Sequence, residues 1–361
     1  MIKNKMTKCT ILIPTYNRPN RLMRLLDYYN KYGKGFNIIV ADSSSNENKK
    51  LNKKNILLFS NLNILHINNY PSKIEPFRKW SNALNYINTK YSVFCADDDF
   101  IIPNGISKSV DFLEKNMDFT IAHGCYLSFY LKTNIKREQQ FLWIPIYLGK
   151  QINFPEARYR LAFHLSNYQI PTLYAVHRTD LLKMTFKETI KYTDDDGFGE
   201  LLPSMLDLVY GKMKKLDVLY SAREIISGSG GQTGKNFNDF IKDRTYEKKY
   251  NKFRECLAKA LVSEEDISKE KAQKLIDKAM NKYLGSSMFK LKLKAGLKRI
   301  VEHNALLKEF YHVYKRFKTS KKQLSVLDKL PPIEYDNKEN PYYEDFIRIK
   351  DAVEGHYRID E

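Results

Sequence analysis

The stretch that organises this chain is Tyr91-Ser-Val-Phe-Cys-Ala-Asp97-Asp98-Asp99-Phe100. Its first half is apolar and strand-forming, so we expect a buried strand that ends in three consecutive carboxylates. Buried carboxylates repel one another and lose hydration, and a divalent cation would relieve both penalties. At the carboxyl end of a strand in an open α/β sheet, Asp-x-Asp can present oxygens to Mg²⁺ or Mn²⁺. A solvated acidic turn is the alternative that the triplet alone leaves open.

Strand-like and helix-like segments alternate on the N-terminal side of this stretch. Residues 9–13 and 37–42 are short apolar runs that predict strands, and a polar run of Ser and Asn follows the second. Residues 62–67 predict a third strand, while 21–30 and 74–88 carry apolar side chains at helical spacing. The alternation indicates repeated βαβ units, and therefore an α/β fold with a mostly parallel sheet flanked by helices.

The regular alternation ends on the C-terminal side of the stretch. Residues 104–116 predict a helix and 119–130 a long strand. Residues 132–151 mix charged and apolar side chains, which suggests a loop and an edge strand lying over a site. A further helix is expected at 199–210, and the Gly-rich run 227–234 indicates a hinge or mobile lid.

After residue 235 the pattern becomes helical and polar. Residues 288–322 keep apolar side chains at helical spacing, and they hold eleven Lys or Arg residues against two acids. Such a face can dock on an anionic membrane surface, or it can be the solvated side of a helix packed on the first domain. Acids outnumber bases from residue 341, so the tail can fold back on that helix. We expect an α/β domain over 1–230 and a mainly helical, basic region with an acidic tail over 235–361.

Composition bounds the class of protein. The 361 residues are 43% hydrophobic and 29% charged, as in globular proteins. The start is polar and no apolar run approaches the ~18 residues of a membrane span, so we expect a cytoplasmic protein, with peripheral contact at the inner face of the membrane as a further expectation. The net charge of +19 predicts an anionic partner. Nucleic acid is not expected, because the chain has no zinc finger or aromatic RNA-binding signature.

Three polar groups follow three of the predicted strands. They are the loop Thr15 to Arg18, the single acid Asp42 and the triplet Asp97 to Asp99. In a βαβ arrangement these loops lie side by side at one edge of the sheet, around a common cleft. Such a cleft offers what a nucleotide diphosphate needs, namely a carboxylate for a base or ribose donor and a cation for the phosphates.

The same residues carry a resemblance to a known family. The motifs Ile11-Leu-Ile-Pro-Thr-Tyr-Asn-Arg-Pro19, Ile38-Ile-Val-Ala-Asp-Ser-Ser44 and Cys95-Ala-Asp-Asp-Asp99, in this order and spacing, resemble those of bacterial family 2 glycosyltransferases with an Asp-x-Asp motif. The resemblance covers roughly residues 8–225 and implies a GT-A-type, Rossmann-like domain. It also implies a nucleotide-sugar half over about 1–130 and an acceptor half over about 131–230.

The resemblance implies roles for the loop residues. The first-strand loop would line the nucleoside pocket, Asp42 would accept from the base, Asp97 would face the ribose and Asp99 would bind the metal, with Asp98 as the second choice for either role. Asp99 and Asp97 are thus the implied ligands of Mn²⁺ or Mg²⁺. The residues expected to bind the nucleotide sugar are Thr15, Tyr16, Asn17, Arg18, Asp42, Lys79, Asp97 and Asp98.

A catalytic base is implied at the start of a later helix. The family has a Glu-Asp-type pair there, and this chain has Gly199-Glu200. Glu200 is therefore the first candidate, and Asp196, within the acidic run 194–196, competes with it. Glu200 can alternatively act only through the dipole of its helix. Where the family often has a metal-binding His, this chain has Ser221-Ala-Arg-Glu224, so Glu224 can replace it or Arg223 can contact the diphosphate.

The implied activity is sugar transfer from a nucleotide diphosphate sugar, expected to be a UDP-sugar, to a hydroxyl acceptor. The resemblance and the single candidate base imply an inverting displacement that depends on a divalent metal. A glycan or lipid-linked acceptor, as in surface polysaccharide synthesis, would account for the basic segment. Two other classes stay open: a nucleotidyltransferase, which the absence of glycine from Thr15 to Pro19 disfavours, and a non-catalytic protein that binds nucleotides or a membrane surface.

Overall fold

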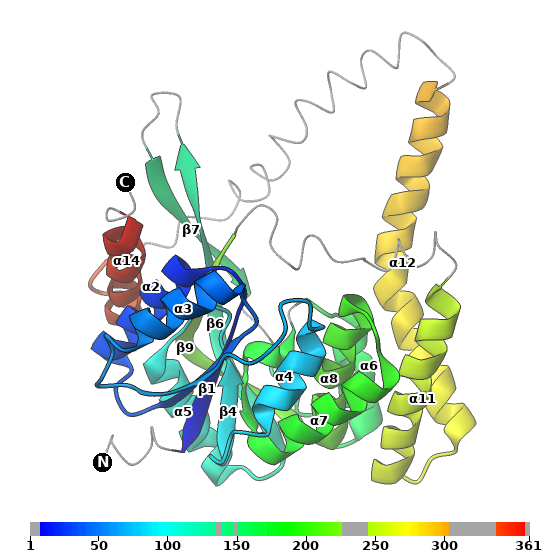
Figure 1. Ribbon diagram of the computed structural model, residues 1–361. Coiled ribbons are helices and arrows are strands. Elements are labelled where there is room, and N and C mark those ends of the chain that lie inside the picture. The colour runs from blue at the N-terminus through cyan, green and yellow to red at the C-terminus, as the bar shows by residue number, and fades with distance from the viewer. Residues whose placement is uncertain are drawn as a thin grey trace.

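A computed structural model of the protein describes residues 8–133, 139–147, 150–169, 171–225, 245–302 and 337–357. These residues form one large sheet with helices on both faces and a helical layer beside it (Figure 1). The strands are β1 (Cys9–Thr15), β2 (Asn37–Asp42), β3 (Asn63–Ile67), β4 (Tyr91–Phe94), β5 (Phe100–Ile101), β6 (Phe119–Thr133), β7 (Gln139–Tyr147), β8 (Val176–Arg178) and β9 (Lys212–Glu224). The helices are α2 (Pro19–Tyr32), α3 (Asn46–Ile56), α4 (Pro76–Leu84), α5 (Pro103–Lys115), α6 (Ala157–Ser166), the 3₁₀ turn η1 (Thr172–Tyr174), α7 (Thr179–Tyr192), α8 (Asp196–Tyr210), α11 (Tyr246–Glu264), α12 (Lys269–Glu302) and α14 (Tyr343–Tyr357).

The N-terminal half of the sheet is parallel. Strands β3, β2, β1 and β4 are neighbours in that order, and helices α2, α3 and α4 connect them along the chain. Thr15 at the end of β1 is in register with Asp42 at the end of β2. The loops that follow β1, β2 and β4 therefore leave the sheet at one edge, as the βαβ pattern predicted.

The other half of the sheet is mixed. Strand β8 is antiparallel to both β4 and β6, whereas β6 and β9 run parallel. The short strand β5 pairs with β9, and β7 pairs with the outer part of β6, which agrees with the edge strand expected within 132–151. The predicted α/β fold class is confirmed.

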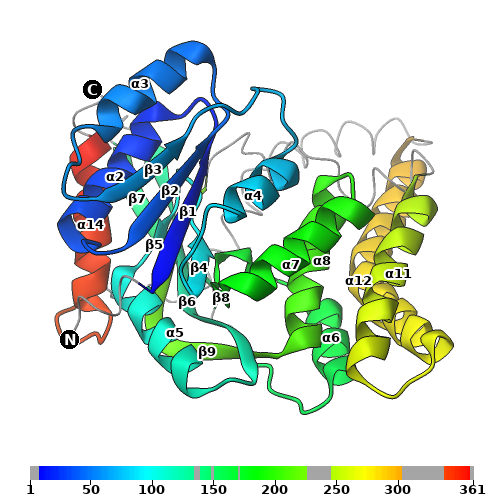
Figure 2. The same ribbon diagram turned by 60° about the horizontal axis from the view of Figure 1, so that its bottom comes forward.

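Apolar side chains leave the central strands on both faces. Ile11 and Ile13 of β1 join the core beneath α2, α5 and α14, whereas Leu12 joins the core beneath α4 and α7. Figure 2 shows these two helical layers on opposite sides of the sheet. Helix α14 contributes buried Phe346 and Ile349 and packs on α2. The described part of the acidic tail thus packs against the α/β core, which differs from the expected contact with the basic segment.

Helix α3 was not predicted from the sequence. Its N-cap is Ser45, whose Oγ accepts a hydrogen bond from the backbone N–H of Asn48. The side chain that it buries is polar: Asn52 is fully buried and donates to Asp42. Because the inward face carries an amide, the apolar periodicity that marks an amphipathic helix is missing.

The C-terminal region is helical, as expected. Helices α11 and α12 share an apolar core with α6 and α8, in which Phe198, Leu257 and Ile276 are fully buried. Among the described residues, no helix combines the length and the apolar character needed to cross a membrane. The expected boundary between residues 230 and 235, the Gly-rich run 227–234 and most of the basic segment 288–322 lie outside the described residues or side chains. The division into two domains stays a prediction.

Candidate active site

The three predicted loops meet at the edge of the sheet. The Thr15 hydroxyl donates to Oδ2 of Asp97 at 2.7 Å, which joins the end of β1 to the acidic triplet after β4. The Lys79 ammonium group donates to the Thr15 carbonyl at 3.2 Å and to the Ser43 hydroxyl at 2.9 Å. Because Ser43 directly follows Asp42, Lys79 joins the end of β1 to the loop after β2. Burial lowers the pKa of Lys79 to about 8.

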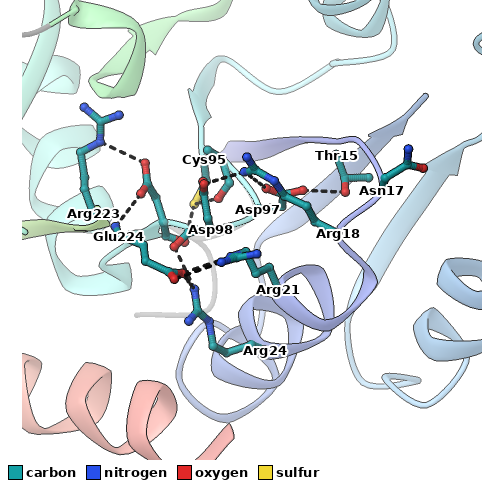
Figure 3. A network of polar contacts seen from close by, with 12 residues as sticks. Thr15, Asn17, Arg18, Arg21, Arg24, Cys95, Asp97, Asp98, Arg223 and Glu224 are labelled. Atoms are coloured by element: carbon teal, nitrogen blue, oxygen red, sulfur yellow. Dashed lines mark hydrogen bonds and ion pairs between the residues drawn. The ribbon is translucent and has the colours of Figure 1, made fainter. Parts of the chain in front are cut away.

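The acidic triplet is buried rather than solvated. Asp97, Asp98 and Asp99 are 3%, 7% and 3% exposed, so the alternative of a solvated turn does not hold. Arg18 bridges the first two: its Nη1 lies 2.6 Å from Oδ2 of Asp98 and 3.3 Å from Oδ1 of Asp97 (Figure 3). Charge-assisted contacts of this kind offset part of the cost of burying carboxylates.

Asp99 is held from the other side of the cleft. Arg223 donates from Nε to Oδ2 of Asp99 at 3.0 Å, and the backbone N–H of Glu224 donates to Oδ1 at 3.0 Å. Both donors come from the end of β9. The guanidinium of Arg223 also lies 4.5 Å from the centre of the Tyr174 ring, a cation–π contact that fixes its orientation.

The buried carboxylates remain short of positive charge. Burial raises the pKa of Asp97 to about 6 and that of Asp99 to about 7, and repulsion from Asp98 adds to both shifts while Arg18 and Arg223 oppose them. A divalent cation would favour the ionised forms, so the donor set fits such an ion. Among the described residues, no three His, Cys, Asp or Glu side chains are grouped closely enough to hold a metal. An ion here needs further oxygens, and Mg²⁺ typically takes them from water and substrate phosphates.

Glu224 is committed to helix α2. Its Oε2 accepts from Nη2 of Arg24 at 2.7 Å, and Arg21 of the same helix donates to both carboxylate oxygens at 3.3 Å. Burial would raise the pKa of Glu224, but these arginines lower it below its ordinary value. Arg24 also donates to the Asp98 carbonyl at 2.9 Å. These bonds give Glu224 a structural role, and its alternative role as a metal ligand stays a prediction.

Arg21 and Arg24 were missed as members of the site. The signal was present, because they lie three positions apart on the predicted helix 21–30 and therefore share one face. What the sequence lacked was the partner, since Glu224 lies two hundred positions away in the chain.

The carboxylate of Asp42 is fully buried and accepts three hydrogen bonds. Its Oδ1 accepts from the Ser44 N–H at 2.8 Å, and its Oδ2 contacts Asn52 at 2.9 Å and Nε2 of His66 at 3.1 Å. Burial alone would raise the pKa of Asp42, but these bonds prevail and lower it to about 2. The expected contact of Asp42 with a nucleobase stays a prediction. Asn52 and His66, which the sequence did not indicate, position the Asp42 carboxylate.

The remaining loop residues take distinct positions. Asn17 has a positive φ of 55°, which is uncommon for a residue other than glycine. Its side-chain oxygen accepts from the Ser45 N–H at 2.8 Å and from Asn48 at 3.1 Å, which fixes this backbone conformation. Tyr16 beside it is 51% exposed, so its ring is accessible to a ligand. The nucleoside-binding role of both residues stays a prediction.

The four acids around the start of α8 divide into two pairs. Asp195 caps α8 by accepting from the Phe198 N–H at 2.8 Å, and Lys249 of α11 forms ion pairs with both Asp194 and Asp195. The other pair, Asp196 and Glu200, lies within the first five residues of α8 and remains exposed.

Glu200 and Asp99 are linked electrostatically through Arg223. The surrounding protein desolvates the Glu200 carboxylate and so raises its pKa. Asp196 raises this pKa further, whereas Tyr168 and Arg223 lower it. Burial and the neighbouring acids Glu75 and Asp195 likewise raise the pKa of Asp196. Arg223 therefore acts on both groups, on the acidic triplet through its hydrogen bond to Asp99 and on the candidate base through its charge.

Gly199 explains why the expected acid pair is absent here. An added Cβ at this position would lie 2.7 Å from the Phe77 ring of α4. Helices α4 and α8 thus approach too closely for a side chain at 199, so Glu200 is the one acid at positions 199 and 200.

The chain is similar in sequence or in fold to known proteins. Residues 10–182 match the family model described as Glycosyl transferase family 2. The structure of S. aureus TarS 1-349 in complex with UDP-GlcNAc aligns with a TM-score of 0.50 at 15% identity, over 77% of this chain and 73% of that one. A mannosyltransferase from Pyrobaculum calidifontis in complex with GDP-Man and Mn²⁺ aligns with a TM-score of 0.48 at 10% identity, over 89% of this chain and 83% of that one. No curated protein sequence matches the chain.

The family match and the TarS alignment confirm the predicted resemblance and the GT-A-type fold. The match ends at residue 182. The acidic triplet lies inside it, whereas Glu200, Arg223 and helices α11 and α12 lie outside it.

Proposed function

We propose that this chain, a glycosyltransferase with a family 2 domain over residues 10–182, transfers a sugar from a nucleotide diphosphate sugar to a hydroxyl acceptor by an inverting displacement. The observation that carries the proposal is the arrangement around Arg223, which donates to Asp99 and whose charge opposes the rise in the pKa of Glu200 that desolvation causes. One site thus combines groups suited to a departing diphosphate with a base suited to an acceptor.

The donor would bind over the loops that follow β1 and β2. The accessible ring of Tyr16 and the fixed backbone of Asn17 would form the nucleoside pocket, with Asp42 on the base and Asp97 on the ribose. Lys79 would keep these two loops together, since its buried ammonium group already bonds to both of them. TarS 1-349, which shares the fold, was crystallised with UDP-GlcNAc, and this favours a UDP-sugar as the donor to test first.

Asp99 and Asp97 would hold a divalent cation, Mn²⁺ or Mg²⁺. When bound, the ion would neutralise charge that develops on the leaving diphosphate. Arg223 and Arg18, which approach the triplet from opposite sides, would supply fixed positive charge to the same phosphates. Because these guanidinium groups are already oriented by the protein, they need little rearrangement when the bond breaks.

Glu200 would act as the general base. It accepts the proton of the acceptor hydroxyl while that oxygen attacks the anomeric carbon, and the bond from this carbon to the diphosphate oxygen breaks. Asp196 is the second candidate, one turn earlier on α8. The acceptor would be a glycan or lipid-linked hydroxyl, reaching Glu200 from the side of α6 and α8. Contact with the inner face of a membrane through the basic segment belongs to the same proposal.

A thermal-shift titration with nucleotide diphosphates, with and without Mn²⁺, tests the donor site. Stabilisation grows with ligand concentration over Kd, so one nucleotide should raise the melting temperature and Mn²⁺ should increase the effect. Asp99→Asn should reduce that response.

Glu200→Gln should keep the thermal response to nucleotide but lose turnover, while Glu188→Gln on the outer helix α7 serves as the control. A chain that responds to no nucleotide would contradict the proposal, and normal turnover in Glu200→Gln would contradict the base assignment.

A further inference from the structure

The carboxylate of Glu200 has a defined partner. The Tyr168 hydroxyl donates to Oε1 of Glu200 at 3.0 Å. Tyr168 follows the C-terminal end of α6, so the contact joins the loop after α6 to the first turns of α8. Glu200 itself remains exposed, as a base that must meet an acceptor requires.

Two aromatic rings fix the position of Tyr168. Tyr283 of α12 meets it edge to face, with ring centres 6.0 Å apart and planes at 90°, and His164 of α6 meets it at 5.5 Å and 71°. Edge-to-face pairs of this kind are favourable beyond their buried area. The tyrosine that contacts the candidate base is therefore placed by a helix from the C-terminal region.

The Tyr168 hydroxyl stays a donor at neutral pH. Burial raises the pKa of Tyr168 well above its ordinary value, and the charge of Glu200 acts in the same direction. Ser204, one turn beyond Glu200 on α8, donates to the Glu200 carbonyl at 3.0 Å and acts on Tyr168 in the opposite direction, lowering its pKa. The net shift is upward, so the Tyr168 hydroxyl keeps its proton for the bond to Glu200.

We propose that Tyr168, held by Tyr283 of α12, is a positioning residue that fixes one carboxylate oxygen of Glu200 and leaves the other free for the acceptor hydroxyl. The inference rests on the proposed role of Glu200 as the base. It extends the catalytic unit to Tyr283 of α12, about a hundred residues beyond the end of the family match at 182.

The effect on Glu200 has a definite sign. The groups that act on its carboxyl group are Tyr168 from the loop after α6, Arg223 from β9 and Asp196 from α8, and Tyr283 of α12 is within electrostatic range. Tyr168 and Arg223 favour the ionised form, while desolvation and Asp196 oppose it. Removing the Tyr168 hydroxyl should therefore raise the pKa of Glu200 and reduce the fraction of ionised base.

The test compares Tyr168→Phe, Tyr283→Leu and Tyr192→Phe with the wild type. In Tyr168→Phe, kcat should fall several-fold and the acidic limb of the kcat/KM profile should move up by about one pH unit, while the thermal shift produced by the nucleotide stays unchanged. Tyr283→Leu should give a smaller change in the same direction, because the ring that holds Tyr168 is lost. Tyr192→Phe, which removes a hydroxyl bonded to Lys259, should behave as the wild type.

A direct titration separates this inference from the proposed function. The carboxyl carbon of Glu200, followed by NMR in protein labelled at glutamate, should titrate at higher pH in Tyr168→Phe than in the wild type, and this measurement needs no substrate. An unchanged titration together with an unchanged kcat/KM profile would overturn the role of Tyr168. If instead Glu200→Gln keeps normal turnover while the titration shifts as expected, the base assignment fails and the contact stands.

Discussion

The guanidinium of Arg24 lies 2.7 Å from the carboxylate of Glu224, and this pair joins helix α2 to the end of β9. The two side chains are only 11% and 16% exposed, so water screens the pair weakly. Arg24 also holds the Asp98 carbonyl, and the backbone of Glu224 holds Asp99. The pair therefore sets the distance between the acidic triplet and the strand that carries Arg223.

Breaking this pair should cost both stability and donor binding. We expect Arg24→Met to lower the free energy of unfolding by about 3 kcal/mol, because it leaves a buried carboxylate with only Arg21. Urea unfolding gives the stability and nucleotide thermal shifts give the binding. The double variant Arg24→Met with Glu224→Leu should recover stability, because a packed apolar pair can replace a buried ion pair. It should not recover nucleotide binding, because the apolar pair does not hold Asp99 in position. A double variant that binds nucleotide normally would show that the pair does not position the site.

Gly199 should not tolerate a side chain. We expect Gly199→Ala to destabilise the protein by about 1–3 kcal/mol, because the added Cβ would overlap the Phe77 ring. Combining it with Phe77→Leu should restore part of the loss, as measured by chemical denaturation of all three variants. Gly285→Ala in α12 is the matched control: nothing lies within 4 Å of the position that an added Cβ would take, so alanine should stabilise that helix by about 1 kcal/mol. Equal effects at 199 and 285 would contradict the packing explanation.

The support of Asp42 by Asn52 should depend on pH. At neutral pH we expect Asn52→Leu to cost about 1–3 kcal/mol, because it removes a buried hydrogen bond to an ionised carboxylate. The pKa of Asp42 is lowered to about 2 in the folded state, against about 3.9 when unfolded. The stabilisation is therefore present above pH 4 and is lost as the pH falls towards 2.

Urea unfolding at a series of pH values measures that dependence. The difference between Asn52→Leu and the wild type should shrink as the pH is lowered from about 4 to about 2. Asn63→Leu removes an exposed bond to Asn37 and should show a small difference at every pH. A penalty for Asn52→Leu that stayed constant through this range would mean that Asn52 does not stabilise the charged form of Asp42.

Lys79 should make stability depend on pH in the alkaline range. Burial lowers its pKa to about 8, whereas an unfolded lysine titrates near 10.4. Between these values the unfolded chain binds the proton and the folded chain does not, so this group adds stability as the pH rises from about 8 to about 10. The free energy of unfolding of the wild type relative to Lys79→Met should increase over this range. No change, or a decrease, would show that the ammonium group is not desolvated.

The sequence predicted the elements whose inward faces are apolar. Strands β1, β2 and β4 and the loops after them follow from runs such as 9–13 and 37–42, and the acidic triplet marks the site because three carboxylates after a buried strand are costly. Helix α3 was missed because its buried side chain is Asn52, which donates a hydrogen bond to Asp42. Apolar periodicity indicates a helix only where the buried side chains are apolar. It gives no signal where a helix buries a polar side chain such as Asn52.

Long-range partners were equally beyond reach. Arg24 and Glu224 look like ordinary surface charges until β9 is placed beside α2, and Tyr168 has no distinguishing neighbour in the chain. Glu200 was identified only through the resemblance to family motifs, and its role stays a prediction. Contacts between residues far apart in sequence depend on the order of strands, which the local pattern does not specify.

The packing of α14 on α2 has a consequence for biosynthesis. Phe346 and Ile349 lie in a core whose other members come mainly from residues 9–129, with further side chains from β8 and β9. While α14 is still inside the ribosome, the surface of α2 that it will cover is exposed to water, although the neighbouring strands have already emerged. The nascent α/β domain therefore exposes an apolar face until α14 is released. During that time chaperones can bind this face, or the chains can associate with one another.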